Sequence, residues 1–157
     1  MNSEALFLAS WLLENKAQVA QDIINGTYLE NNKEKYQNKT CIFYSEDTPY
    51  HCTVYGGRTF ICRLFGLSSF HDKNGKTVFR PCKFFKKEDL EKISPNLDHR
   101  QYTEEEINKI LGSCPPVMSD IMEQGVEVTP NQTETFPLRE ILPKAIEQLL
   151  FERKVEE

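Results

Sequence analysis

Hydrophobic positions near the start of the chain recur at the spacing of an amphipathic helix. Steps of three and four residues place these positions along one helical face. Ser3 precedes the pattern and Gly26 follows it, and these residue types commonly begin and end helices. We expect one helix over residues 4–24, and then a polar segment, 29–39, that forms a short helix or a loop. The main apolar positions of the helix are Ala5, Leu8, Ala9, Leu12, Val19, Ala20 and Ile23.

The second half of the chain has the same helical character in shorter pieces. One short helix is expected over residues 87–93. Thr103 and Glu106 have the spacing of a capping box, which predicts a helix beginning after Thr103. Pro115 favours the first turn of another helix, which Gly125 would end.

Residues 40–85 lack a sustained period and hold four of the five cysteines and two of the three histidines. The stretches CTVY and KTVFRP are typical of short strands, and DKNGK between Phe70 and Thr77 predicts a hairpin turn. A segment this irregular needs something besides a hydrophobic core to fix it. Metal ligation would serve, because ligand bonds replace missing packing.

Together these elements predict an α+β fold that is mostly α, with helices around an irregular cysteine-rich metal core and a small β-hairpin. The last helix is expected over residues 138–152, with Pro143 at its first turn or at a kink. A chain of 157 residues fits one domain. We expect a single domain, 1–157, that consists of a helical segment (1–39), a metal-binding core (40–85) and a second helical segment (86–157).

Composition narrows the function classes only slightly. The net charge of −5 argues against nucleic-acid binding, which usually needs a basic face. The chain has no run of about 18 apolar residues, so no membrane span is expected. Its first residues lack the basic flank and cleavage site of a secretory signal. We therefore expect a cytoplasmic protein, in which thiols stay reduced and bind metal more often than they form disulfides.

Four cysteines in the middle of the chain form the candidate ligand set. Cys41, Cys52, Cys62 and Cys82 are separated by ten, nine and nineteen residues. Four thiolates complete a tetrahedral zinc site or hold one [4Fe–4S] cluster. The spacing alone leaves buried structural thiols open as an alternative, because zinc sites usually contain a C-x2-C pair and this chain has none.

The residues around these cysteines carry a further pattern. From residue 41 the sequence reads CIFYSEDTPYHCTVYGGRTFICRLFG, and GLSSFHDKNGKTVFRPC then ends at Cys82. This order and spacing resembles the second half of the YkgJ-type cysteine-cluster family, a zinc- or iron-chelating domain, over about residues 40–83. The matching positions are Cys41, Cys52, Val54, Tyr55, Arg58, Cys62, Arg63 and Cys82.

The resemblance implies one metal centre held by these four cysteines. Two departures limit it: residues 1–40 contain no cysteine where the family has its CxxCxxCC-type motif, and Thr59 stands where proline is usual. The chain therefore looks like a reduced member of the family with enough thiols for one site. The choice between Zn(II) and an iron–sulfur cluster stays open, with a slight preference for the cluster because C-x2-C pairs are missing.

Other side chains are candidates for supporting roles around the metal. Arg58 and Arg63 would offset the negative charge of a four-thiolate centre, and Tyr55 is expected beside them. The alternative for the arginines is ordinary surface pairing with nearby carboxylates. Cys114 and His51 are possible extra ligands, although a packed thiol and a surface histidine are the simpler interpretations. Backbone N–H groups of the glycines at 56, 57 and 66 could donate to the sulfurs.

The sequence therefore favours a metal-binding protein without catalysis of its own, in a structural or redox role. Members resembling this family include a flagellin lysine methylase, so an accessory or catalytic part of a protein-modifying system is the first alternative. The chain offers no recognisable S-adenosylmethionine site. A zinc-stabilised protein-interaction module is the second alternative, with the aromatic-rich centre or the last helix as its docking surface. Substrate, protein partner and oligomeric state do not follow from the sequence.

Overall fold

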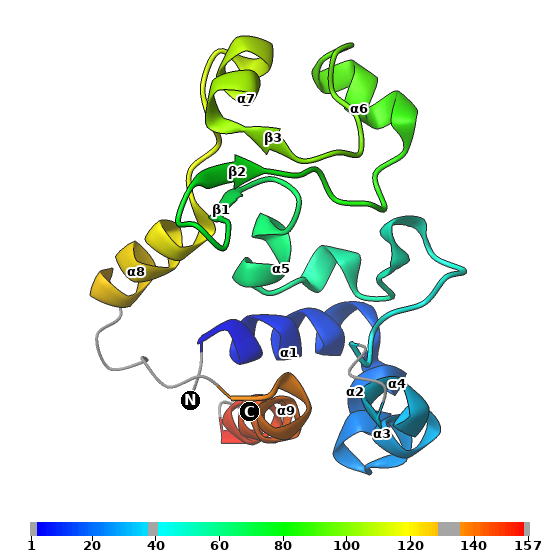
Figure 1. Ribbon diagram of the computed structural model, residues 1–157. Coiled ribbons are helices and arrows are strands. Elements are labelled where there is room, and N and C mark those ends of the chain that lie inside the picture. The colour runs from blue at the N-terminus through cyan, green and yellow to red at the C-terminus, as the bar shows by residue number, and fades with distance from the viewer. Residues whose placement is uncertain (1–2, 38–40, 129–135, 156–157) are drawn as a thin grey trace. The chain divides into compact units, whose positions relative to one another are not determined.

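The computed structural model describes residues 3–37, 41–128 and 136–155 (Figure 1). The chain divides into two compact units, Met1–Thr59 with Asn131–Glu157, and Phe60–Pro130. Each unit has its own hydrophobic core. The boundary after Thr59 falls inside the segment expected as one cysteine-rich core, so residues 40–85 contribute to both units.

The first unit is helical. Helices α1 and α2 each pack against α9, and α1 also packs against α2 (Figure 1). Their apolar faces meet in a core whose fully buried members include Leu8, Leu12, Ile23, Leu142 and Ile146. The helices of this unit are α1 (Ser3–Asn15), α2 (Ala17–Ile24), α3 (Thr27–Asn31), α4 (Lys33–Gln37) and α9 (Leu138–Val155).

The single helix predicted over residues 4–24 was wrong, because the chain breaks into α1 and α2 at Lys16. Lys16 has φ −147° and ψ 55°, which lies outside the helical region. Neither proline nor glycine marks the break in the sequence. The predicted stop at Gly26 is confirmed, since this residue follows α2 with φ 78°.

Residues 41–59 form turns rather than strands. Cys52 pairs with Tyr44 in an isolated antiparallel bridge. Two short 3-10 turns, Pro49–His51 and Tyr55–Gly57, lie on either side of Cys52. The strand predicted for CTVY was therefore wrong, because the chain turns again immediately after the bridge.

The second unit combines a three-stranded antiparallel sheet with short helices. The sheet has the order β1–β2–β3, with Ser69 opposite Phe79 and Val78 opposite Thr103. The predicted hairpin turn is confirmed: the Asp72 carboxylate accepts the N–H groups of Asn74 (2.8 Å) and Lys76 (2.9 Å). The elements of this unit are α5 (Phe60–Leu64), β1 (Ser69–His71), β2 (Thr77–Phe79), α6 (Lys87–Ile93), β3 (Tyr102–Thr103), α7 (Glu104–Leu111) and α8 (Met118–Val128).

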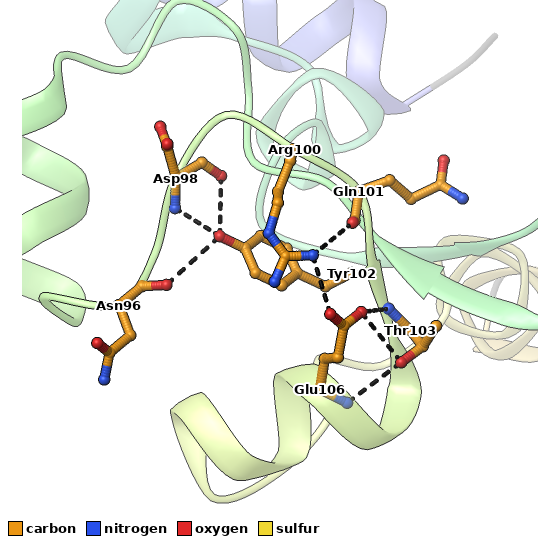
Figure 2. A network of polar contacts seen from close by, with 7 residues as sticks. All are labelled: Asn96, Asp98, Arg100, Gln101, Tyr102, Thr103 and Glu106. Atoms are coloured by element: carbon orange, nitrogen blue, oxygen red, sulfur yellow. Dashed lines mark hydrogen bonds and ion pairs between the residues drawn. The ribbon is translucent and has the colours of Figure 1, made fainter.

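A buried tyrosine fixes the loop before β3 (Figure 2). The side chain of Tyr102 is fully buried in the core of the second unit. Its hydroxyl accepts the Asp98 N–H at 2.6 Å and lies 3.3 Å from the Asp98 carbonyl and 3.4 Å from that of Asn96. The Arg100 guanidinium covers the ring at 3.9 Å. The phenol therefore supplies hydrogen bonds to a loop that has no secondary structure of its own.

The predicted capping box at the start of α7 is confirmed. The Thr103 hydroxyl accepts the Glu106 N–H (3.3 Å), and the Glu106 carboxylate accepts the Thr103 N–H (2.8 Å). The Glu106 carboxylate also pairs with Arg100 at 3.0 Å. These contacts hold the pKa of Glu106 below its usual value, first through the Thr103 N–H and then through Arg100.

The predicted bounds of the helix before Gly125 were wrong. Helix α8 begins at Met118 and passes through Gly125 to Val128, so Pro115 is not in its first turn and Gly125 does not end it. Residues 126–128, which follow the glycine, therefore belong to α8. The predicted start of the last helix is confirmed, since α9 begins at Leu138; Pro143 lies in its interior and not in its first turn.

The structure confirms an α-rich α+β fold with a small sheet. The metal core that the sequence placed at its centre stays a prediction. Within the described ranges, no helix combines the length and hydrophobicity that crossing a bilayer requires.

Candidate metal centre

The five cysteines are distributed over both units. Cys41 and Cys52 belong to the first unit, and Cys62, Cys82 and Cys114 belong to the second. All five lie within the described residues, and none of them forms a disulfide there. Cys41 is exposed and the other four are partly buried.

A turn and a bridge hold Cys41 and Cys52 in one part of the first unit. The Tyr44 N–H donates to the Cys41 carbonyl at 3.0 Å, which closes a turn that begins at Cys41. Tyr44 is in turn the bridge partner of Cys52. The Thr53 N–H donates to the Phe43 carbonyl at 2.9 Å and continues the pairing. The backbone thus brings the two cysteines toward each other although ten residues separate them.

The Tyr28 phenol belongs to the same unit as these cysteines. Burial raises the pKa of Tyr28, a hydrogen bond with Thr53 lowers it, and the charges of Cys41 and Cys52 raise it further. Because the turn at Cys41 and the bridge at Cys52 both involve Tyr44, we refer to Cys41 and Cys52 as the first thiol pair.

In the second unit, Gly66 brings the chain after α5 against Cys82. Gly66 has φ 79°, a conformation that strongly favours glycine. A Cβ atom placed on Gly66 would lie 2.5 Å from the Cys82 nitrogen and 2.7 Å from its Cα. Cys62 lies in α5, four residues before this contact. Cys62 and Cys82 therefore share one neighbourhood, which we treat as the second thiol pair.

The arginines predicted around the ligands are in different surroundings. The Arg58 guanidinium lies 3.8 Å from the centre of the Tyr55 ring, and Tyr55 stacks on Tyr50 at 4.6 Å. A cation over an aromatic face is attracted by the ring electrons. Arg63 is exposed on α5. The charge-offsetting role of both arginines and the place of Tyr55 beside the ligands stay predictions.

The turn before Cys52 contains two strained residues. Tyr50 has φ 59° and His51 has φ 53°, both in the left-handed region that non-glycine residues rarely adopt. The His51 ring stacks on Tyr44 at 5.8 Å. Strain of this kind concentrates at functional sites. The sequence signal for it is weak, because tyrosine rarely adopts this region and histidine is only one of the residue types enriched there. A ligand role for His51 stays a prediction.

Cys114 is packed within the second unit. Its sulfur lies 3.2 Å from the hydroxyl oxygen of Ser69, which is fully buried. The Ser69 N–H donates to the Pro116 carbonyl, so Ser69 contacts both Cys114 and Pro116, two residues further along the chain. These contacts agree with the packed-thiol alternative, and the extra-ligand role stays a prediction.

The glycines have a steric function that the sequence did not reveal. The Gly57 N–H donates to the Val54 carbonyl at 2.9 Å, so the predicted donation to a sulfur was wrong for this residue. A Cβ on Gly57 would lie 2.7 Å from the Trp11 ring, and one on Gly56 would lie 3.1 Å from it. The two glycines therefore allow the indole of Trp11 to pack directly on the backbone.

The donor geometry is incomplete within the part of the chain that the structure describes. There, no three His, Cys, Asp or Glu side chains form a group that could hold a metal ion. The chemistry of the four thiols nevertheless suits a soft metal such as zinc or iron. A single centre with four cysteine ligands therefore stays a prediction.

Comparisons with known proteins give no independent indication of function. No protein-family model, no curated protein and no solved structure matches this chain. The resemblance of residues 40–83 to the cysteine-cluster family therefore stays a prediction from the sequence. The residues of the site are thus the basis for any functional proposal.

Proposed function

We propose that the protein binds one metal centre, a Zn(II) ion or a [4Fe–4S] cluster, through Cys41, Cys52, Cys62 and Cys82. The observation that supports this proposal is the set of backbone contacts at the predicted ligands: Tyr44 contacts both Cys41 and Cys52, and Gly66 lies against Cys82. The fifth cysteine differs, since Cys114 is engaged with Ser69. Four thiolates are the full ligand set of either centre.

Metal binding here would be coupled to folding. A metal site is rarely complete before the metal arrives, and its binding free energy then becomes folding free energy. The two thiol pairs suit a coupling of metal binding to folding, because each pair would provide two of the four ligands. The irregular turns around Cys52 also suit it, since a ligand bond would fix a segment in which Cys52 pairs through an isolated backbone bridge. The proposed role is therefore structural, and redox as well if the centre is iron–sulfur.

Metal analysis of the anaerobically purified protein tests the proposal. An iron–sulfur centre gives iron, labile sulfide and broad visible absorption, whereas a zinc centre gives a colourless protein with stoichiometric zinc. Cys62→Ser should lose most of the metal, and Cys114→Ser should retain it. A chain that folds with neither metal contradicts the proposal, as does a Cys62→Ser variant that keeps its metal and its melting temperature.

A further inference from the structure

The whole-chain charge of −5 hides a strongly basic segment. Residues 60–87 contain seven Lys or Arg and a single acidic residue, Asp72, which gives a net charge of +6. The remainder of the second unit, residues 88–130, contains three basic and ten acidic residues and carries −7. A local field of this size affects association even when the net charge of the chain has the opposite sign.

All seven basic side chains of this segment are exposed. Large apolar side chains between them are exposed as well: Phe65 is 60% and Leu67 is 53% accessible. Isolated exposed apolar residues need no explanation, but a group of them among cations on one short segment is typical of an interaction surface. The seven basic residues are Arg63, Lys73, Lys76, Arg80, Lys83, Lys86 and Lys87.

Part of this segment comes together in one place. The close contact of Gly66 with Cys82 sets the stretch 63–67 beside the stretch 82–86. The Phe85 N–H donates to the Cys82 carbonyl at 3.0 Å, which turns the second stretch back on itself. We call the resulting surface the basic–apolar patch, and it consists of Arg63, Phe65, Leu67, Lys83 and Lys86.

We propose that the basic–apolar patch binds an acidic protein segment that also carries apolar side chains. Carboxylates would meet Arg63, Lys83 and Lys86, and apolar side chains would cover Phe65 and Leu67. Opposite charge would steer the encounter, and burial of the two exposed apolar side chains would supply affinity. None of the proposed metal ligands belongs to the patch, although Arg63 and Lys83 directly follow Cys62 and Cys82 in the sequence.

The chemistry of the patch favours a protein segment over a nucleic acid. A nucleic acid carries a charge on every phosphate and would extend from the patch toward a chain that is acidic elsewhere. Phe65 offers one ring on which a base could stack, whereas Leu67 is aliphatic and offers none. The aromatic ring of Phe84 next to the patch already has the Lys83 ammonium 4.7 Å from its centre.

A binding assay with the full chain tests the proposal. The probe is a short fluorescent peptide in which glutamate alternates with leucine, and anisotropy reports its binding. Two comparison probes are an all-glutamate peptide and single-stranded oligo(dT). We expect the glutamate–leucine peptide to bind most tightly, with an affinity that falls as salt rises.

Matched variants locate the interaction. The double variant Lys83→Glu/Lys86→Glu should weaken peptide binding by about tenfold or more. Lys73→Glu/Lys76→Glu makes the same charge change at the exposed hairpin turn and should alter binding by less than about threefold, because it lies outside the patch. Leu67→Ser should weaken binding, whereas Ile93→Ser, which alters a side chain that is also 53% accessible, should not.

Each other outcome overturns the proposal. If the glutamate–leucine peptide does not bind, the patch does not recognise an acidic segment with apolar side chains. Equal losses in the two double variants mean general charge attraction rather than a patch. Tighter binding of oligo(dT) than of the peptide assigns the surface to nucleic acid instead. Circular dichroism and thermal melting of every variant establish that a loss of binding is not a loss of fold.

Discussion

At the scale of single residues, Gly66 is the position where the structure most clearly requires glycine. Its positive φ and the backbone of Cys82 beside it both exclude a side chain. Gly75 supplies a matched comparison, because it has φ 74° but a Cβ atom placed on it would meet nothing within 4 Å. Substitution of Gly75 by alanine therefore measures backbone strain alone, whereas substitution of Gly66 measures backbone strain together with the steric conflict.

Gly75→Ala should cost about 1–2 kcal/mol, which is the strain of placing a non-glycine residue in the left-handed region. Gly66→Ala should cost clearly more in urea unfolding, because its methyl group must also displace the Cys82 backbone. It should also lower metal uptake, whereas Gly75→Ala should leave metal uptake unchanged. Equal unfolding free energies and equal metal contents for the two variants would mean that the contact with Cys82 is not as close as described.

Thr103 offers a second residue-scale prediction, since it caps α7. Thr103→Ala should lower the free energy of unfolding by about 1 kcal/mol, because it leaves a helix N–H without its side-chain acceptor. Thr103→Ser keeps the hydroxyl and should recover most of that loss. Chemical denaturation of the three proteins at neutral pH gives the comparison. A Ser variant as unstable as the Ala variant would contradict the capping role.

At the scale of elements, Glu106 makes the junction of β3 and α7 sensitive to pH. Its folded pKa is lowered, first by the Thr103 N–H and then by Arg100, so the ionised form favours the folded state. This contribution is fully present above the unfolded pKa of a glutamate. It is lost as the pH falls through the lowered folded pKa.

Glu106→Gln should therefore flatten the decline in stability on acidification below about pH 5, which is where a glutamate begins to protonate in the unfolded chain. Glu105→Gln changes the neighbouring exposed position and is the control. Unfolding free energies measured from neutral pH down to about pH 3 report the difference. If the Glu106 and Glu105 variants had parallel pH profiles, the capping-box carboxylate would not carry this dependence.

Local sequence signals predicted several elements well. The capping box, the hairpin turn at Asp72 and the short helix at 87–93 depend on neighbouring residues, and the structure contains all three. The third strand at Tyr102 pairs with β2, which is distant in the sequence, so a two-residue stretch alone does not predict it. Neither proline nor glycine marks the break at Lys16.

At the scale of the whole molecule, two properties were hidden from the sequence for different reasons. The division of the chain into two units after Thr59 depends on contacts between residues that are distant in the sequence. The hydrophobic pattern along the chain does not contain that information. The basic segment at 60–87 was visible in the sequence, but averaging charge over the chain concealed it. For the candidate site, the cysteine set is a prediction from the sequence, whereas the backbone contacts of Tyr44 with Cys52 and of Gly66 with Cys82 are visible only in the structure.

The division of the four cysteines into two pairs yields the prediction that bears most directly on the metal centre. The decisive measurement is metal per chain in anaerobically purified wild-type protein, Cys41→Ser/Cys52→Ser and Cys62→Ser/Cys82→Ser. One centre with four thiolate ligands predicts that either double variant loses essentially all the metal of the wild type. Retention of half of the metal in each variant, or of full metal in either, would contradict a single four-cysteine centre.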